Sequence, residues 1–103
     1  MQRVIDRKLY DTDAAEQIAK YAPLTDRSDF HFLIETLYKT SDGEYFLHAE
    51  GGAATKHAEK ISNEKRPGEE IQLLTDEDAL DWCEEREIEG ETVVKEFDNL
   101  IET

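Results

Sequence analysis

The sequence predicts an α+β domain in which a small antiparallel sheet is packed by three to four helices. Residues 30–49 contain two β-prone runs separated by a turn, which is the pattern of a hairpin. Elsewhere, apolar residues recur at helical spacing, most clearly over 93–101. Because the chain has 103 residues, we expect residues 1–103 to form a single domain, with an acidic helical region at 69–103.

Two elements are expected before the central hairpin. The short apolar runs 4–5 and 8–10 indicate a small hairpin or an extended entry segment. Strong helix formers follow over 13–22, and Pro23 would end that helix. One face of this expected helix carries its apolar side chains, Ala15, Ile18, Ala19 and Ala22.

The central hairpin is the clearest element of the sequence. Its expected strands are 30–38 and 45–49, joined by the turn Ser41-Asp42-Gly43. Apolar side chains alternate onto both sides of the first strand, so we expect each face to be partly covered.

The chain after the hairpin is expected to be less regular. Gly51-Gly52 lacks the context of a phosphate-binding motif and indicates a loop that needs positive φ. A short helix is predicted over 55–61, a loop over 62–68 and a short strand over 71–74.

The last third of the chain is expected to be mainly helical. Thr75 is a typical N-cap, with Asp78 at the capping-box position, and Cys83 falls on the inner side of the helix that follows. The apolar stripe over 93–101 predicts one more helix.

Composition limits the possible functions. The chain carries 26 acidic and 12 basic side chains, a net charge of −14, so it would be repelled by nucleic acid and by anionic membranes. No apolar run approaches the ~18 residues of a membrane span, and the N-terminus lacks the apolar core of a signal peptide. The single cysteine, Cys83, excludes an internal disulfide. We therefore expect a cytoplasmic protein.

Nearly all of the net charge lies in the last third of the chain. Residues 1–66 carry 12 acidic and 10 basic side chains, whereas residues 67–103 carry 14 acidic and 2 basic ones. Solubility, adaptation to high salt and binding to a basic partner can each explain acidic residues. Adaptation to high salt would spread the charge along the chain, so the clustering argues against it.

An acidic helix can imitate nucleic acid. A helix rises about 1.5 Å per residue, and duplex DNA carries one charge per about 1.7 Å of its axis. We therefore expect the acidic side chains within 69–91 to contact a basic, nucleic-acid-binding partner protein. The expected contact residues are Glu69, Glu70, Asp76, Glu77, Asp78, Asp81, Glu84, Glu85, Glu87 and Glu89.

Metal binding and self-association are the alternatives. His31 and His48 could meet on neighbouring strands of the hairpin, and carboxylates or His57 could complete a site, although no zinc-ligand spacing is present. We expect no cofactor. An exposed hairpin edge could instead pair two copies into a homodimer, and the protein would then be a scaffold domain.

Nothing in the sequence assembles a catalytic site, so we expect that the protein is not an enzyme. The acidic neighbours of Cys83 would raise the pKa of its thiol, and this residue is expected to belong to the core. The G-x-S-x-G motif of a nucleophile elbow is absent.

Three stretches together resemble a widespread family of small, acidic, mostly uncharacterised proteins of bacterial and archaeal genomes, plasmids and prophages. They are 8–12, 35–52 and 74–82, and the most specific part is the central block, ETLYKT followed by GEYFL and EGG. The resemblance covers most of residues 4–86, departs from the family pattern at 62–68, and transfers no catalytic residues.

The resemblance implies a function, because small acidic proteins of mobile elements are similar in kind to anti-CRISPR and anti-restriction inhibitors. The protein would block the basic nucleic-acid channel of a CRISPR effector or another defence nuclease, acting as a DNA mimic. The alternative function is a small metal-stabilised or dimeric scaffold domain.

Overall fold

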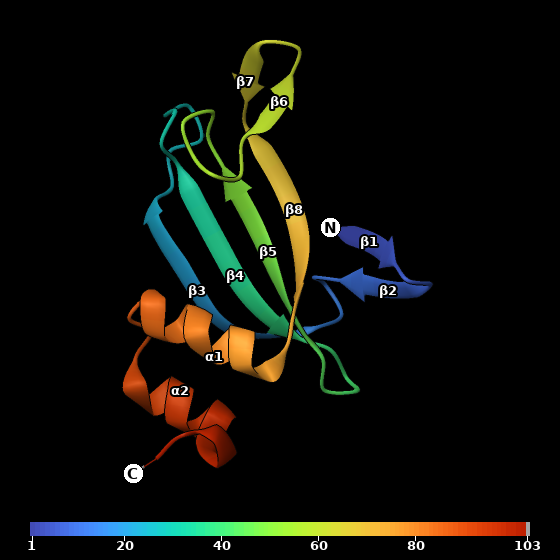
Figure 1. Cartoon of the computed structure of the whole chain (residues 1–103), viewed down its shortest axis with the longest axis vertical. Helices are drawn as coiled ribbons and strands as arrows, with labels where there is room; N and C mark the ends of the chain where they lie inside the picture. The colour runs from blue at the N-terminus through green and yellow to red at the C-terminus, as the bar shows by residue number, and fades with distance from the viewer. Residues whose placement is uncertain (103) are drawn as a thin grey trace.

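In the computed structural model, which describes residues 1–102, the chain is built around a four-stranded antiparallel sheet (Figure 1). Its strands are β3 (Glu16–Leu24), β4 (Leu33–Lys39), β5 (Tyr45–Gly51) and β8 (Gly68–Leu74), side by side in that order. Two small hairpins flank it: β1 (Gln2–Ile5) with β2 (Lys8–Asp11), and β6 (Glu59–Ile61) with β7 (Glu64–Arg66). Helices α1 (Asp76–Glu85) and α2 (Gly90–Phe97) and the 3-10 turn η1 (Asp98–Leu100) follow the last strand.

The prediction of an α+β sheet packed by three to four helices is wrong, because the structure is mostly β. Strands hold 43% of the residues and helices 21%, and within residues 1–102 only α1 and α2 are longer than one turn. Two segments that were expected to be helical, 13–22 and 55–61, are instead extended or irregular. In the described part of the chain, no helix has the length and apolar character needed to cross a membrane.

Residues 16–22 belong to the edge strand β3 because tertiary contacts outweigh their helix propensity. β3 pairs with β4, and the centre of β4 is buried. Without β3, the backbone of β4 would be an open sheet edge with unpaired N–H and C=O groups. The register of β3 shifts between Gln17 and Ala19, and this bulge brings Ile18 as well as Ala19 against the core. The bulge in β3 thus accounts for the adjacent apolar residues Ile18 and Ala19, whose spacing had indicated one face of a helix.

The expected helix over 55–61 is a tight loop followed by β6. Its glycines allow backbones to approach closely. A Cβ on Gly52 would lie 2.3 Å from the Phe30 carbonyl oxygen, and a Cβ on Gly68 would lie 1.9 Å from the His57 carbonyl oxygen. The expectation of positive φ at Gly51-Gly52 is wrong, because neither residue has it. Close packing explains Gly52 instead.

Other expected elements are confirmed. The N-terminal hairpin, the central hairpin and the strand that ends at Leu74 all form. The Thr75 hydroxyl caps α1 by accepting a hydrogen bond from the Asp78 amide at 3.1 Å. The C-terminal apolar stripe forms α2 and η1, and Phe97 packs on Tyr45 with ring centroids 5.3 Å apart. This contact holds the last helix against the sheet.

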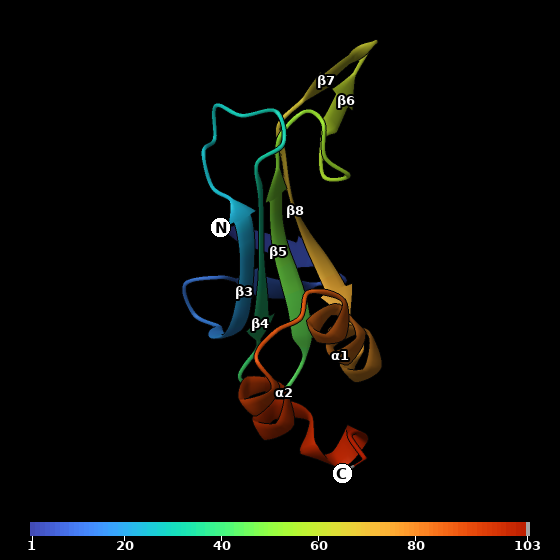
Figure 2. The ribbon, with the colours of Figure 1, turned by 90° about the vertical axis from the view of Figure 1, so that its left-hand side faces the viewer.

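Different elements cover the two faces of the sheet. Figure 2 views the sheet edge-on and shows α1 on one side of it, where Leu37 and Leu47 pack against Trp82 in the larger core. On the opposite face, Tyr10 of β2 meets Phe46 edge to face, with ring centroids 5.5 Å apart, in a smaller core. Each face of the central strands is therefore partly covered, as the sequence predicts for the first strand of the hairpin.

The turn between β1 and β2 yields a stability prediction. Asp6 and Arg7 have φ of 52° and 66°, a conformation that glycine adopts at little cost and other residues do not. We expect Arg7→Gly to raise the free energy of unfolding by up to about 1 kcal/mol. Gly43→Ala should lower it by about 1 kcal/mol, because Gly43 has φ of 90° in otherwise open space. Urea denaturation measures both, and two changes of the same sign would contradict this account.

Candidate functional site

A fully buried carboxylate, that of Glu35, lies on β4 beneath α1. Three side chains donate hydrogen bonds to it: His57 through Nε2 at 2.6 Å, Trp82 through Nε1 at 2.9 Å and Arg86 through Nε at 2.7 Å. His57 lies in the loop after β5, Trp82 on α1, and Arg86 at the C-cap of α1. One carboxylate therefore joins the sheet, a loop and a helix.

The Glu35 cluster is ionic. Burial alone would raise the pKa of the Glu35 carboxyl, but the hydrogen bonds from His57, Arg86 and Trp82 outweigh burial and lower that pKa to about 2. The hydrogen bond to Glu35 raises the pKa of His57, against the opposing effect of burial, and Glu70 raises it further by accepting from Nδ1 at 2.9 Å. A carboxylate thus faces an imidazolium and a guanidinium inside the protein.

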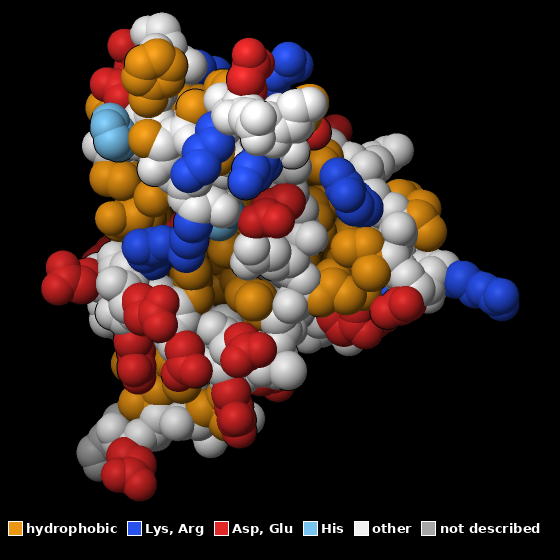
Figure 3. Space-filling model, turned by 45° about the horizontal axis from the view of Figure 1, so that its top comes forward, with side chains coloured by type: hydrophobic (Ala, Val, Ile, Leu, Met, Phe, Trp, Pro, Cys, Tyr) orange, Lys and Arg blue, Asp and Glu red, His pale blue; other side chains and the backbone are white. Residues whose placement is uncertain are grey.

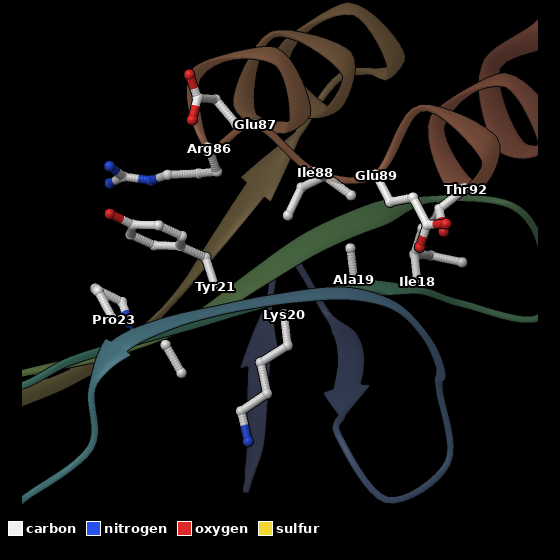
Figure 4. A pocket seen from close by; sticks show the side chains of 11 residues that line it. Ile18, Ala19, Lys20, Tyr21, Pro23, Arg86, Glu87, Ile88, Glu89 and Thr92 are labelled. Carbon is white, nitrogen blue, oxygen red and sulfur yellow. The ribbon is translucent and has the colours of Figure 1, made fainter.

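This cluster draws Arg86 away from the surface. Its guanidinium lies over the ring of Tyr21, 4.6 Å from the centroid (Figure 4), and its side chain is only 19% exposed. Arg86 is the only basic residue within 69–91. The most acidic segment of the chain therefore turns its one cation inward.

Eight carboxylates cover the solvent side of α1 and the turn that follows it. All eight are exposed, and none has a cation within 4.0 Å among residues 1–102. In Figure 3, acidic side chains gather at the helical end of the molecule and basic ones lie mainly toward the opposite end. We call the eight residues the acidic helical face: Asp76, Glu77, Asp78, Asp81, Glu84, Glu85, Glu87 and Glu89.

The other two predicted contact residues, Glu69 and Glu70, lie elsewhere. Neighbouring residues on β8 point to opposite faces of the sheet. Glu69 Oε1 lies 2.9 Å from His48 Nε2 on the face away from α1, whereas Glu70 accepts from His57 and from Gln72, the latter at 2.6 Å. The ten acids predicted as one contact set are thus divided among three places.

The structure does not bring His31 and His48 together. β4 begins at Leu33, so His31 lies exposed in the preceding loop, where its amide donates to Asp29, and His48 pairs with Thr36. The expected pair fails because the first strand is shorter than its apolar run indicated. His57, expected only as an alternative ligand, is part of the buried Glu35 cluster.

Cys83 is a core residue, as the sequence predicts. It is 1% exposed, and burial, followed by the negative charge of Glu96, raises the pKa of its thiol to about 11. A thiol held this far from ionisation is a poor nucleophile.

An open groove of about 480 Å³ runs between the free edge of β3 and the connection from α1 to α2 (Figure 4). Ile18 and Ile88 line it, and Glu87 and Glu89 of the acidic helical face stand on its helical side. Sequence patterns reveal neither this groove nor the Glu35 cluster, because each joins residues far apart in the chain. The one feature of the sequence that could have indicated the Glu35 cluster is the carboxylate of Glu35 within a mostly apolar strand.

Comparison of the chain with protein families, with characterised proteins and with solved structures finds no match. The resemblance to small acidic proteins of mobile elements therefore stays a prediction. No comparison supports the anti-CRISPR assignment drawn from it.

We expect Glu35→Gln to lower the free energy of unfolding by about 3 kcal/mol, because it leaves the charges of Arg86 and His57 without their buried partner. Glu44→Gln is the matched control, since Glu44 pairs with Lys8 at 2.9 Å but is 53% exposed. It should lose far less stability. Urea denaturation at neutral pH measures the free energy of unfolding of both variants. Equal losses of stability would show that the buried Glu35 cluster stabilises the protein no more than the exposed pair of Glu44 with Lys8 does.

Proposed function

We propose that the protein is a non-enzymatic binding protein whose acidic helical face docks on a basic surface of another protein, of the kind that ordinarily holds nucleic acid. The observation that carries this proposal is the set of eight exposed carboxylates with no cation within 4.0 Å among residues 1–102. Such a surface attracts a Lys- and Arg-rich partner and orients it during encounter.

The charge density of α1 supports nucleic-acid mimicry. Six of the eight carboxylates lie on its ten residues, which span about 15 Å, so α1 carries one charge per about 2.5 Å. A single nucleic-acid strand carries one per about 3.4 Å and a duplex one per about 1.7 Å. Glu77, Asp81 and Glu84 follow the i, i+4, i+7 spacing and therefore form one stripe.

Three of the acids on α1 are placed where they oppose folding, whereas Asp76, Glu77 and Asp78 lie in its first turn, where the helix dipole favours them. Glu84 and Glu85 lie in the last turn of α1, which holds no basic residue, and there they face the negative end of the helix dipole. Asp81 repels Glu84 and Glu85 at helical spacing. Local choices that reduce stability are expected at functional surfaces, because binding can select for them.

The fold holds this surface rigidly. Trp82 and Arg86 bind the buried Glu35 carboxylate, so the position of α1 is set before any partner arrives. The groove beside Glu87 and Glu89 offers space for a partner side chain at the end of the face. A partner would therefore pay little entropy for ordering α1.

The test compares two variants with the same change of net charge. Glu77→Lys with Asp81→Lys and Glu84→Lys reverses the central stripe of the acidic helical face. Glu16→Lys with Glu59→Lys and Glu64→Lys changes exposed acids on other elements. Each protein is used to capture partners from a lysate of its host at low salt, and its affinity for a partner held by the unaltered protein is then measured.

We expect the stripe variant to lose at least about tenfold in affinity and the control to lose much less, with binding that weakens as salt rises. The unaltered protein should also displace a labelled nucleic acid from that partner. Circular dichroism should show that both variants are folded. Equal affinity of the two variants, or a partner that keeps its nucleic acid, would refute the proposal and leave solubility as the role of the charge.

A further inference from the structure

On the sheet face away from α1, three potential metal ligands converge. His48 and Glu50 are two residues apart on β5 and share a face, and Glu69 of β8 lies directly opposite Glu50. His48 Nε2 is 2.9 Å from Glu69 Oε1 and 3.7 Å from Glu50 Oε1. One ligand atom from each residue lies within 4.8 Å of the others. Two hydrogen-bonded strands therefore fix all three side chains on a rigid base.

This arrangement brings two like charges together. Glu50 and Glu69 are a cross-strand pair, and carboxylates in that relation repel each other. Glu50 contributes a largely buried charge, since its side chain is 13% exposed, whereas the side chain of Glu69 is 47% exposed. A cation held between the carboxylates would convert this repulsion into attraction.

Arg27 orients the Glu50 carboxylate so that one of its oxygens is available to such a cation. Its guanidinium binds Oε2 of Glu50, whereas Oε1 faces His48. A carboxylate that is oriented through one oxygen and free at the other is typical of metal ligands, which are commonly held by a neighbouring hydrogen-bond donor.

We propose that His48, Glu50 and Glu69 bind one divalent transition-metal ion, with zinc as the best fit. One imidazole nitrogen and two carboxylate oxygens match the ligands that zinc accepts, and water would fill the remaining position. Ligand atoms around tetrahedral zinc lie about 3.4 Å apart, and the two separations from His48 Nε2 bracket that value. The ion replaces the direct contact between His48 and Glu69.

This site does not depend on the acidic helical face, because its residues lie on the opposite side of the sheet from α1. The stripe variant Glu77→Lys with Asp81→Lys and Glu84→Lys should therefore bind zinc as the unaltered protein does. Failure of one proposal leaves the other standing.

The test is calorimetric titration of zinc chloride into the whole chain, purified without a polyhistidine tag and treated with a chelator. His48→Gln and Glu69→Gln remove one ligand each. His31→Gln and Glu59→Gln are the matched controls, since both residues are exposed and lie outside the cluster. Thermal denaturation of each variant without zinc checks that it folds.

We expect one zinc ion per chain, at least about tenfold weaker binding in His48→Gln and in Glu69→Gln, and unchanged binding in the controls. Zinc should also raise the unfolding temperature of the unaltered protein but not that of His48→Gln. Absence of saturable binding, or equal losses in ligand and control variants, would overturn the proposal and assign zinc uptake to scattered surface carboxylates.

Discussion

The buried carboxylate of Glu35 is the interaction on which the rest of the structure depends. It accepts hydrogen bonds from His57, Trp82 and Arg86, which belong to a loop and to the helical segment that packs on the sheet. A buried charge without partners is unfavourable by several kcal/mol, so these three segments must assemble together around it. The carboxylate therefore specifies how α1 lies on the sheet as much as apolar burial does.

The same interaction shapes the outside of the protein. Arg86 is held by Glu35 and by the ring of Tyr21, so it cannot screen the carboxylates on the solvent side of α1. The acidic helical face is consequently more negative than the sequence of α1 and its cap alone would indicate. On the other face, Arg27 similarly binds Glu50 and leaves one of its oxygens facing His48. In both places a carboxylate with little solvent exposure fixes the position of a neighbouring arginine side chain.

Local signals in the sequence predicted the elements that depend on local chemistry. The central hairpin followed from two β-prone runs around Gly43, and α1 followed from the Thr75 cap. The prediction of a helix over 13–22 is wrong because the β-bulge between Gln17 and Ala19 imitates helical spacing, and the pairing with β4 that produces this bulge is a non-local contact. The Glu35 cluster and the His48 cluster could not be read from spacing, because their members lie up to 51 residues apart. The concentration of acids near α1 is visible in the sequence. The sequence does not show that Glu69 and Glu70 lie apart from those acids, because that follows from their position on β8, where neighbouring side chains point to opposite faces of the sheet.

The most direct test of the Glu35 account is a carbon-13 NMR titration of its side-chain carboxyl, assigned by comparison with Glu35→Gln. The folded pKa of about 2 lies below the ordinary value of 4.5. The ionised form therefore contributes stability above pH 4.5 that is lost as the pH falls toward 2. We predict that Glu35 stays ionised through this range until the protein itself unfolds in acid. A carboxyl that titrates at or above 4.5 in the folded protein would contradict the central place given to this interaction.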